Sequence, residues 1–454
     1  MIVIDVNIID MINSRLDVSF YRSRFHFTSQ SYPTLNLSEL LWVNPTVKYD
    51  NLSDKDFISF VPMEVVDEKD GKIAEQRTTT ISKTKGFTKF KENDLIWAKI
   101  TPCMQNGKSA IARNLVNGYG CGSTEFYVLR PKTDNVLIEY IHFILRDKRV
   151  LESAKNSFGG SAGQQRVSSG YLKSIQIPLP PKEIQQQIVN LYNRAVEEKQ
   201  AKEQEAQALL AGIDDYLLKE LGIELPENVG NERYFEVNIW DLIGGRLDVF
   251  YYRKEFRDLF EIIKNKSEKK LRNYLTSINY GASVSNEYVE NGIPFLRIKD
   301  LLPNEIQKSE IVYLPYEMKK KLQTSFVKKD DFLISRSGTI GVAAIVTDEF
   351  DEFAFGSFMI RFSTQNINRQ FLSYYINSTI GQYYFLRNRI GAIQSNITIP
   401  TIKDLPIPDI TIVKQNEIAE HIQFIRARAK RLQEEGREGL ERAKGEIEKR
   451  IIGV

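Results

Sequence analysis

The sequence has few of the residues that enzymes most often use for catalysis. Its 454 residues include only three histidines and two cysteines. His26, His142 and His421 are isolated from one another in the sequence, so no serine–histidine or metal–histidine site can be assembled from them. Cys103 and Cys121 form neither a CxxC pair nor a ligand cluster, which is typical of thiols in a reducing cytosol. We therefore expect a cytoplasmic protein with no metal site and no active site of its own.

Membrane spans, secretion signals and nucleotide-binding loops are missing as well. No stretch approaches the roughly 20 uninterrupted apolar residues of a membrane span. The N-terminal MIVIDVNIID carries acidic residues in its apolar run and no basic lead, so no signal peptide is expected. The glycine-rich segment 159–163 lacks the GK[ST] ending of a phosphate loop. No Asn-Pro-Pro-aromatic or Asp-Pro-Pro-aromatic element is present, which argues against amino-methyl transfer by this chain.

Strong charge of one sign is also lacking. The net charge of +3 is too small to indicate nucleic-acid binding by itself. The charge is uneven, however: residues 182–224 carry five basic and nine acidic side chains, whereas residues 412–454 carry ten and eight. An apolar fraction of 42% can build hydrophobic cores, and 454 residues suggest two or three domains.

What the sequence does contain is a repeat of itself. The segment VNIIDMINSRLDVSFYRSRF from Val6 recurs as VNIWDLIGGRLDVFYYRKEF from Val237, with twelve of twenty positions identical. Between the two repeated regions the halves barely resemble each other. This pattern indicates one architecture used twice to recognise two different things. A second set of matches lies near the end of each half: Gln164/Gln394, Lys173/Lys403, Ile177/Ile407, Pro178/Pro408, Gln185/Gln415 and Ile188/Ile418.

Each half predicts a globular region followed by a long helix. Short β-like runs such as DLIWAKI (94–100) and TEFYVLR (124–130) are separated by turn signals, and a helix is expected over roughly 138–153. After a proline cluster, apolar residues recur at helical spacing to the end of each half. A helix of ~40 residues is ~60 Å long and can bury its apolar stripe against a second such helix. Two separate helices on two separate domains are the alternative.

The sequence therefore predicts an α+β fold. It is a tandem duplication of a mixed α/β globular domain followed by a long helix, with the two helices packing as an antiparallel coiled coil. Such packing would relate the globular regions by a pseudo-twofold axis. The expected segments are a first globular domain, a first spacer helix, a second globular domain and a second spacer helix, at residues 1–181, 182–222, 232–411 and 412–454.

Polar loops beside aromatic residues are the best candidates for ligand contacts. In the DNA major groove, Arg pairs with guanine and Asn or Gln with adenine, while Lys and Ser suit phosphates. Ordinary surface loops are the alternative interpretation. The candidate DNA-contacting residues are Lys99, Thr101, Gln105, Asn106, Lys108, Gln164, Gln165, Arg166, Arg297, Lys299, Ser335, Arg336, Ser337, Thr339, Gln394, Ser395 and Asn396.

The repeated Arg-Leu-Asp near the start of each half favours a shared role. Because the trio is identical in both halves, it cannot distinguish two targets. A structural ion pair or the docking of a partner protein is the better interpretation. The candidate partner-docking residues are Arg15, Asp17, Tyr21, Arg246, Asp248 and Tyr252.

Taken together, these features resemble the specificity subunits of type I restriction–modification systems, over essentially the whole chain. The first half departs from the pattern, because residues 94–107 are three residues longer than their counterpart and the first half lacks a GIPFLR element. The motifs that carry the resemblance are RLDVxxY (15–21), RLDVxYY (246–252), DFLISRSGTIG (331–341), GIPFLR (292–297) and IPLPPKEIQQQI (177–188).

The resemblance implies two target-recognition domains, each reading one half of an asymmetric bipartite DNA site, with the helices setting the spacer. It implies double-stranded DNA, two methylation subunits and a restriction motor-nuclease subunit as partners. S-adenosylmethionine and the adenine-N6 chemistry would belong to the methylation subunits, and this chain would hold no cofactor. A self-sufficient DNA methyltransferase or nuclease is one alternative, against which the missing catalytic motifs argue. A coiled-coil scaffold without a DNA role is another, against which the diverged loops argue.

Overall fold

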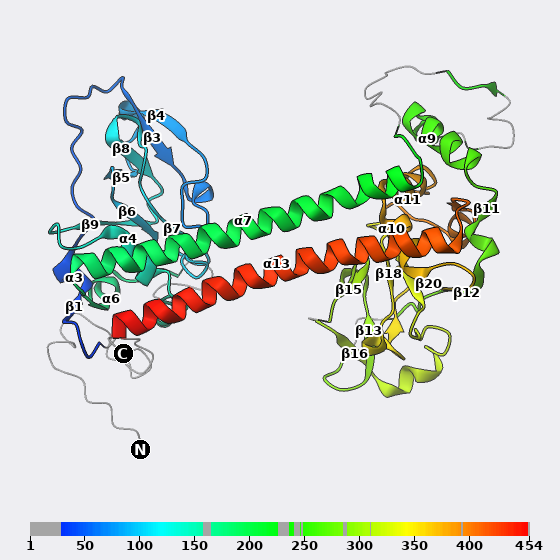
Figure 1. Cartoon of the computed structure of the whole chain (residues 1–454). Helices are drawn as coiled ribbons and strands as arrows, with labels where there is room; N and C mark the ends of the chain where they lie inside the picture. The colour runs from blue at the N-terminus through cyan, green and yellow to red at the C-terminus, as the bar shows by residue number, and fades with distance from the viewer. Residues whose placement is uncertain are drawn as a thin grey trace. The chain divides into compact units, whose positions relative to one another are not determined.

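The structure, a computed structural model, describes residues 29–157, 165–225, 236–239, 246, 248–284, 288–308, 310–391 and 394–452. Its contacts divide the chain into two compact units. The first unit comprises Met1–Lys202 and Glu434–Val454, and the second unit comprises Glu203–Gln433 (Figure 1). The division falls inside both long helices, so each unit contains a segment of each helix. Within the described residues, no helix is long and apolar enough to cross a membrane.

Two four-stranded sheets form the first unit. All four residues of strand β6 are buried, which accounts for its uninterrupted apolar sequence LIWA. The main sheet is antiparallel, in the order β2 (Leu41–Val43), β9 (Phe126–Pro131), β6 (Leu95–Ala98) and β7 (Ser109–Ile111). The second sheet, in which β3 and β8 are parallel, has the order β4 (Arg77–Thr80), β3 (Phe57–Val61), β8 (Tyr119–Gly122) and β5 (Thr88–Lys91).

The second unit repeats this arrangement, which confirms the predicted tandem duplication. Its main sheet is antiparallel, in the order β12 (Leu275–Tyr280), β20 (Met359–Thr364), β17 (Phe332–Ser335) and β18 (Ala343–Ile345). Its smaller sheet again has one parallel pair, β13 with β19, in the order β16 (Val312–Leu314), β13 (Ile293–Leu296) and β19 (Ala354–Phe355). A separate hairpin is formed by β14 (Leu301–Leu302) and β15 (Glu305–Ile306).

Short helices precede and follow the strands of each main sheet: α3 and α9 come before the strands, and the other short helices follow the last strand. The helix predicted over roughly 138–153 is in fact two, because the carboxylate of Asp147 accepts the Arg149 N–H and caps a new helix there. The short helices are α3 (Leu37–Leu40), α4 (Ile138–Leu145), α5 (Lys148–Asn156) and α6 (Ser169–Lys173) in the first unit, and α9 (Lys254–Asn265), α10 (Arg369–Asn377), α11 (Thr379–Arg387) and α12 (Ile399–Lys403) in the second.

A two-stranded antiparallel ladder leads into each long helix. In the first unit β1 (Thr34–Asn36) pairs with β10 (Gln176–Pro178), and in the second β11 (Lys269–Lys270) pairs with β21 (Pro406–Ile407). The helices that follow are α7 (Lys182–Glu220) and α13 (Ile412–Ile452).

The two long helices pack antiparallel within each unit. In the first unit, Lys202 forms an ion pair with Glu435 at 2.7 Å, while Gln187 accepts a hydrogen bond from Arg450. As residue numbers increase along α7, the numbers of their contact residues on α13 decrease, so the two helices run in opposite directions. In the second unit, the pairs are Glu205 with Arg428, Tyr216 with His421 and Glu220 with Lys414.

A buried glutamine anchors the start of each long helix to its unit. Gln185 is fully buried; its carbonyl accepts the Leu137 N–H at 2.9 Å, and its amide donates to the carbonyl oxygens of Asn135 and Pro180. Gln415 is equally buried and accepts the Asn368 N–H at 2.9 Å. Anchoring of the long helix thus explains why a glutamine occurs at this position in both halves of the sequence.

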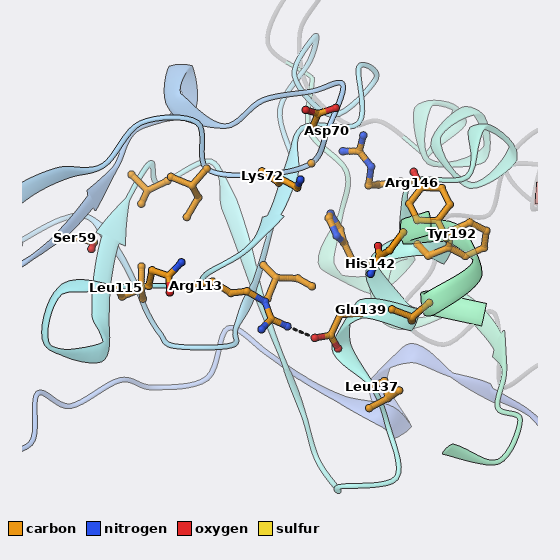
Figure 2. Close-up of a pocket in the computed structure, with 18 of the residues that line it drawn as sticks. Ser59, Asp70, Lys72, Arg113, Leu115, Leu137, Glu139, His142, Arg146 and Tyr192 are labelled. Atoms are coloured by element: carbon orange, nitrogen blue, oxygen red, sulfur yellow. Dashed lines mark hydrogen bonds and ion pairs between the residues drawn. The ribbon is translucent and has the colours of Figure 1, made fainter. Parts of the chain in front are cut away.

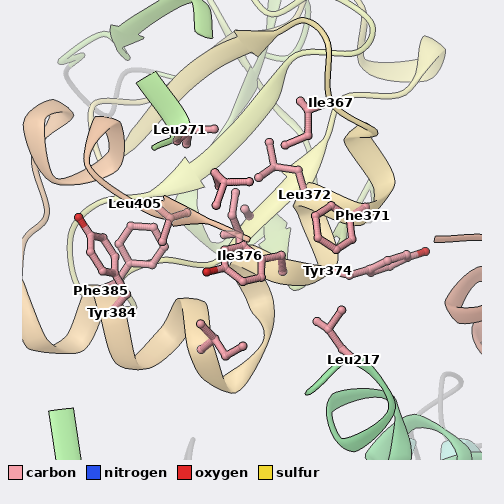
Figure 3. Packing of buried hydrophobic residues seen from close by; sticks show 14 of the residues in the cluster. Leu217, Leu271, Ile367, Phe371, Leu372, Tyr374, Ile376, Tyr384, Phe385 and Leu405 are labelled. Atoms are coloured by element: carbon pink, nitrogen blue, oxygen red, sulfur yellow. The ribbon is translucent and has the colours of Figure 1, made fainter. Parts of the chain in front are cut away.

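Each unit has its own apolar core, which includes residues of both long helices. In the first unit, Ile188 of α7 and Ile447 and Ile451 of α13 belong to the cluster that also holds the main sheet and α4. In the second unit, Leu217 of α7 is fully buried against α10 and α11, together with the aromatic residues shown in Figure 3. The helices are therefore integral to both cores.

Asp94 is a buried charge beneath the main sheet of the first unit. Its carboxylate is 1% exposed, accepts two hydrogen bonds of 2.7 Å from Arg130 and caps the Lys91 N–H. Replacing Asp94 by asparagine is expected to lower the free energy of unfolding by about 2 kcal/mol, because a charge-assisted hydrogen bond to Arg130 is lost. Urea unfolding of the full chain would measure this, with the exposed Asp134→Asn as control. Equal midpoints for the two variants would contradict the prediction.

Candidate nucleic-acid interface

In the first unit, three segments that are distant in sequence meet at the end of β6. The Lys99 N–H donates to the Glu125 carbonyl at 2.9 Å, and the Lys99 carbonyl accepts the Val167 N–H at 2.9 Å. The Thr101 N–H donates to the Gln165 carbonyl at 3.0 Å. The loop that follows β6 is therefore held between the residue before β9 and the segment before α6.

The second unit forms the same three hydrogen bonds. The Arg336 N–H donates to the Phe358 carbonyl at 2.8 Å, and the Arg336 carbonyl accepts the Ile397 N–H at 2.8 Å. The Gly338 N–H donates to the Ser395 carbonyl at 3.1 Å. We call this shared set of backbone bonds the frame.

Equivalent positions of the frame carry different side chains in the two units. Arg166 is bridged to Ile100 in the first unit as Asn396 is bridged to Ser337 in the second. Together with the backbone bonds above, this bridge makes seven pairs of positions equivalent. Three of these pairs form what we call the frame triplet, which is Lys99, Glu125 and Arg166 in the first unit, and Arg336, Phe358 and Asn396 in the second.

The triplet of the first unit is charged. Nε and Nη2 of Arg166 each donate to a different carboxylate oxygen of Glu125, both at 2.9 Å. These hydrogen bonds from Arg166 lower the pKa of Glu125, and the charge of Lys99 adds to the effect. Lys99 itself lies with Nζ 5.5 Å from the centre of the Tyr127 ring. The carboxylate of Glu125 therefore pairs with Arg166 and also feels the charge of Lys99.

The triplet of the second unit has one cation, one aromatic ring and one amide. The guanidinium of Arg336 lies 4.8 Å from the centre of the Tyr280 ring, a cation–π arrangement. Phe358 is 50% exposed. The side-chain amide of Asn396 donates to the Gln394 carbonyl at 2.9 Å. The same frame thus presents a different surface chemistry.

The other predicted contact residues of the first unit lie in or beside the loop after β6. Gln105 and Asn106 are exposed, and the Asn106 amide donates to the Glu68 carboxylate at 3.2 Å. Lys108 is half-buried and donates through Nζ to the Met63 carbonyl at 3.3 Å. Gln164 lies outside the described residues. The structure therefore brings the described members of this set to one end of the main sheet.

In the second unit, the other predicted residues divide into three groups. Ser335 and Ser337 are buried, and the Ser335 hydroxyl accepts the Val342 N–H at 2.9 Å, so in this structure they support the loop from within. Thr339, Gln394, Ser395 and Asn396 are exposed or half-buried around that loop. Arg297 and Lys299 follow β13, where they form ion pairs with Asp300 and Glu310 respectively.

The repeated Arg-Leu-Asp motif forms an ion pair in the second unit. Arg246 and Asp248 are 2.6 Å apart, and Arg246 also donates to the Arg389 carbonyl at 2.6 Å. Tyr252 is buried, so its side chain belongs to the fold of the unit. Docking of a partner at this motif stays a prediction. Its counterparts in the first half, Arg15, Asp17 and Tyr21, lie outside the described residues.

A cavity of about 640 Å³ lies in the first unit beside α4 and the start of α7 (Figure 2). Burial lowers the pKa of His142, which lines it, to about 3, so this histidine is neutral. Arg146 donates to three carbonyl oxygens, those of Gly107, Glu68 and Lys69. These bonds tie the loop after β6 to the turn at 67–71. The cavity could not be predicted from the sequence, because its walls come from segments far apart along the chain.

Sequence reasoning also missed Glu125, Phe358 and Tyr280. A signal was available for the first two, because each follows closely on a Gly-Ser pair, at 122–123 and 356–357, that leads into the last strand of the main sheet. Within the described part of the chain, no group of three or more His, Cys, Asp or Glu residues is arranged to hold a metal ion.

Two similar units that present different side chains on one frame are typical of a protein that recognises a two-part target. A family model described as "Type I restriction modification DNA specificity domain" matches residues 33–208 and 252–442. The chain therefore belongs to the type I restriction modification DNA specificity domain family.

Individual relatives match over shorter stretches. The chain is 32% identical over 166 residues to the type I restriction enzyme EcoEI specificity subunit of Escherichia coli, which covers 36% of this chain and 28% of that protein. It is 36% identical over 154 residues to the EcoAI specificity subunit of the same organism, covering 34% and 26%. The alignments thus span about a quarter of the length of these relatives.

A solved structure shares the fold of the chain. It is described as "Structural basis underlying complex assembly and conformational transition of the type I R-M system", and the similarity covers 93% of this chain and 97% of that one. The TM-score is 0.55 at 16% sequence identity, so the likeness concerns the fold alone.

Proposed function

We propose that the chain is the DNA-reading subunit of a type I restriction–modification complex. Each unit reads one half of an asymmetric bipartite site in double-stranded DNA. The observation that carries this proposal is the frame, which is the same in both units and holds different polar, charged and aromatic side chains. A family of DNA specificity domains supports the same conclusion.

The chain supplies recognition in this proposal, and its partners supply chemistry. Two methylation subunits carry S-adenosylmethionine and transfer the methyl group to adenine, and a restriction subunit joins them for cleavage. The long helices α7 and α13 set the distance between the half-sites and provide the docking surface for the methylation subunits. The modest net charge of +3 fits a division in which the partners contribute much of the phosphate attraction.

The proposal is tested by mapping methylated adenines in cells that express the chain together with its methylation subunits. We expect methylation at one asymmetric bipartite site with an unread spacer, and none when the chain is left out. The purified chain alone should transfer no methyl group from S-adenosylmethionine. Methylation by the isolated chain would favour a self-sufficient methyltransferase, and a complex whose methylation does not depend on the chain would favour a scaffold.

A further inference from the structure

The frame triplet places three side chains at equivalent positions, but their chemistry differs between the units. In the first unit, the exposed Arg166 is held by Glu125, which lies against Lys99 through a backbone bond of the frame. In the second unit, an exposed phenylalanine and an amide take the places of the glutamate and the arginine. A shared backbone with exchanged side chains is what a base-reading position requires.

We propose that the frame triplet determines one base pair in each half-site, with Arg166 selecting guanine in the first and Asn396 selecting adenine in the second. This inference rests on the proposed function and names the residues that carry its specificity. Glu125 is a positioning residue that acts through Arg166, and Phe358 contacts the methyl group of the thymine paired with the adenine.

Arg166 suits guanine because of its donors and its orientation. A guanidinium has five N–H donors in a rigid plane, and guanine offers two acceptors, O6 and N7, on its major-groove edge. Glu125 engages two of those donors in a bidentate pair, which fixes the plane of the group before DNA arrives. A side chain that is already ordered loses less conformational freedom on binding.

Asn396 and Phe358 suit an A·T pair for a different reason. An asparagine amide carries one donor and one acceptor side by side, which matches N7 and N6 of adenine. An aromatic edge makes an apolar contact with the C5-methyl group of thymine. The guanidinium of Arg336 is stacked on Tyr280. Its charge therefore lies beside Asn396 and Phe358, where it suits a contact with a DNA phosphate.

The test uses the complex of the chain with its methylation subunits and a panel of duplexes. Each duplex carries the DNA sequence that the wild-type complex methylates, with one base pair changed. Arg166→Gln should weaken binding to the wild-type site by about 10- to 100-fold and abolish discrimination at one G·C pair only.

Glu125→Gln should reduce discrimination at that same pair, with the unfolding midpoint unchanged. Arg166→Asn should shift the preference there from guanine towards adenine, and Asn396→Arg should shift one A·T pair of the other half-site towards guanine.

The matched control is Arg77→Gln. Arg77 also forms a bidentate pair with an exposed carboxylate, that of Glu75, at 2.8 Å for both bonds, but it lies in β4 outside the frame. Its loss should leave base preference unchanged at every position.

The remaining outcomes separate this inference from the proposed function. Arg166→Gln could instead weaken binding to all duplexes equally and reduce the slope of the logarithm of the binding constant against the logarithm of the salt concentration by about one. Arg166 then contacts a phosphate, and the inference is overturned. If the wild-type complex is selective but the triplet variants keep its preference, the inference also fails while the proposed function stands. If the wild-type complex itself shows no base preference, the proposed function fails.

Discussion

Exchanging residues 37–168 for the matching segment of a relative with a different target is expected to change one half of the methylated site and leave the other half intact. The frame explains where the exchange must end. Because Val167 and Gln165 bond to the loop after β6, and Arg166 is bonded to Glu125, a cut before Arg166 would combine halves of two different frames. The exchange keeps the ladder of β1 with β10, which leads into α7.

The expected effect of this exchange is close to all-or-none. Each mismatched base pair costs about 1–3 kcal/mol, so even two altered pairs would weaken binding to the old site by roughly 30-fold or more. Mapping methylated adenines for the exchanged chain measures both halves at once. A matched exchange in the second unit should change only the other half. A change in both half-sites from a single exchange would contradict reading by separate units.

Replacing Gln185 by leucine is expected to destabilise the first unit by about 3–5 kcal/mol, because three backbone groups lose their hydrogen-bond partner. Those groups are the Leu137 N–H and the carbonyl oxygens of Asn135 and Pro180. Gln415→Leu should cost less, about 2–4 kcal/mol, because Gln415 satisfies two backbone groups, the Asn368 N–H and the Ile410 carbonyl.

Gln186 offers a matched control for this prediction, since it is the next residue of α7, is exposed, and donates a hydrogen bond from its side-chain amide to Asn190 on the same helix. Gln186→Leu should change the free energy of unfolding by no more than about 0.5 kcal/mol. Hydrogen exchange separates the units: Gln185→Leu should speed exchange at Leu137 and in the first turns of α7, while peptides of the second unit keep their rates. Equal protection in the two variants would show that Gln185 does not anchor the helix.

Features with a strong local signal could be predicted from the sequence. Apolar residues at helical spacing after a proline cluster gave both long helices, and α7 and α13 begin at Lys182 and Ile412. The repeated glutamines and isoleucines indicated a shared arrangement at those helix starts, and Gln185 and Gln415 show what it is. The helical signal is strong because helix geometry depends on residues that are close in sequence, whereas the partners of Gln185 at positions 135 and 137 came only with the structure.

Features that depend on tertiary pairing could not be predicted in the same way. The three pairs of the frame triplet stand at offsets of 237, 233 and 230 along the chain, so no constant shift of the sequence aligns them. Loops of different length lie between the frame points and change the offset at each step. The burial of Ser335 and Ser337 was missed for a related reason, because a serine in a polar loop carries no mark of which neighbour will cover it.

Every hydrogen bond of the frame joins backbone atoms, so the frame does not depend on the side chains that its residues carry. A codon change at position 125, 166, 358 or 396 to any residue type except proline leaves those bonds intact, because all of these supply the same backbone N–H and carbonyl. A change at the codon of Gln185 or Gln415 instead removes a buried side chain that holds a helix. Under the proposed function, a substitution in the frame triplet can therefore change one base pair of the methylated site while the protein keeps its fold.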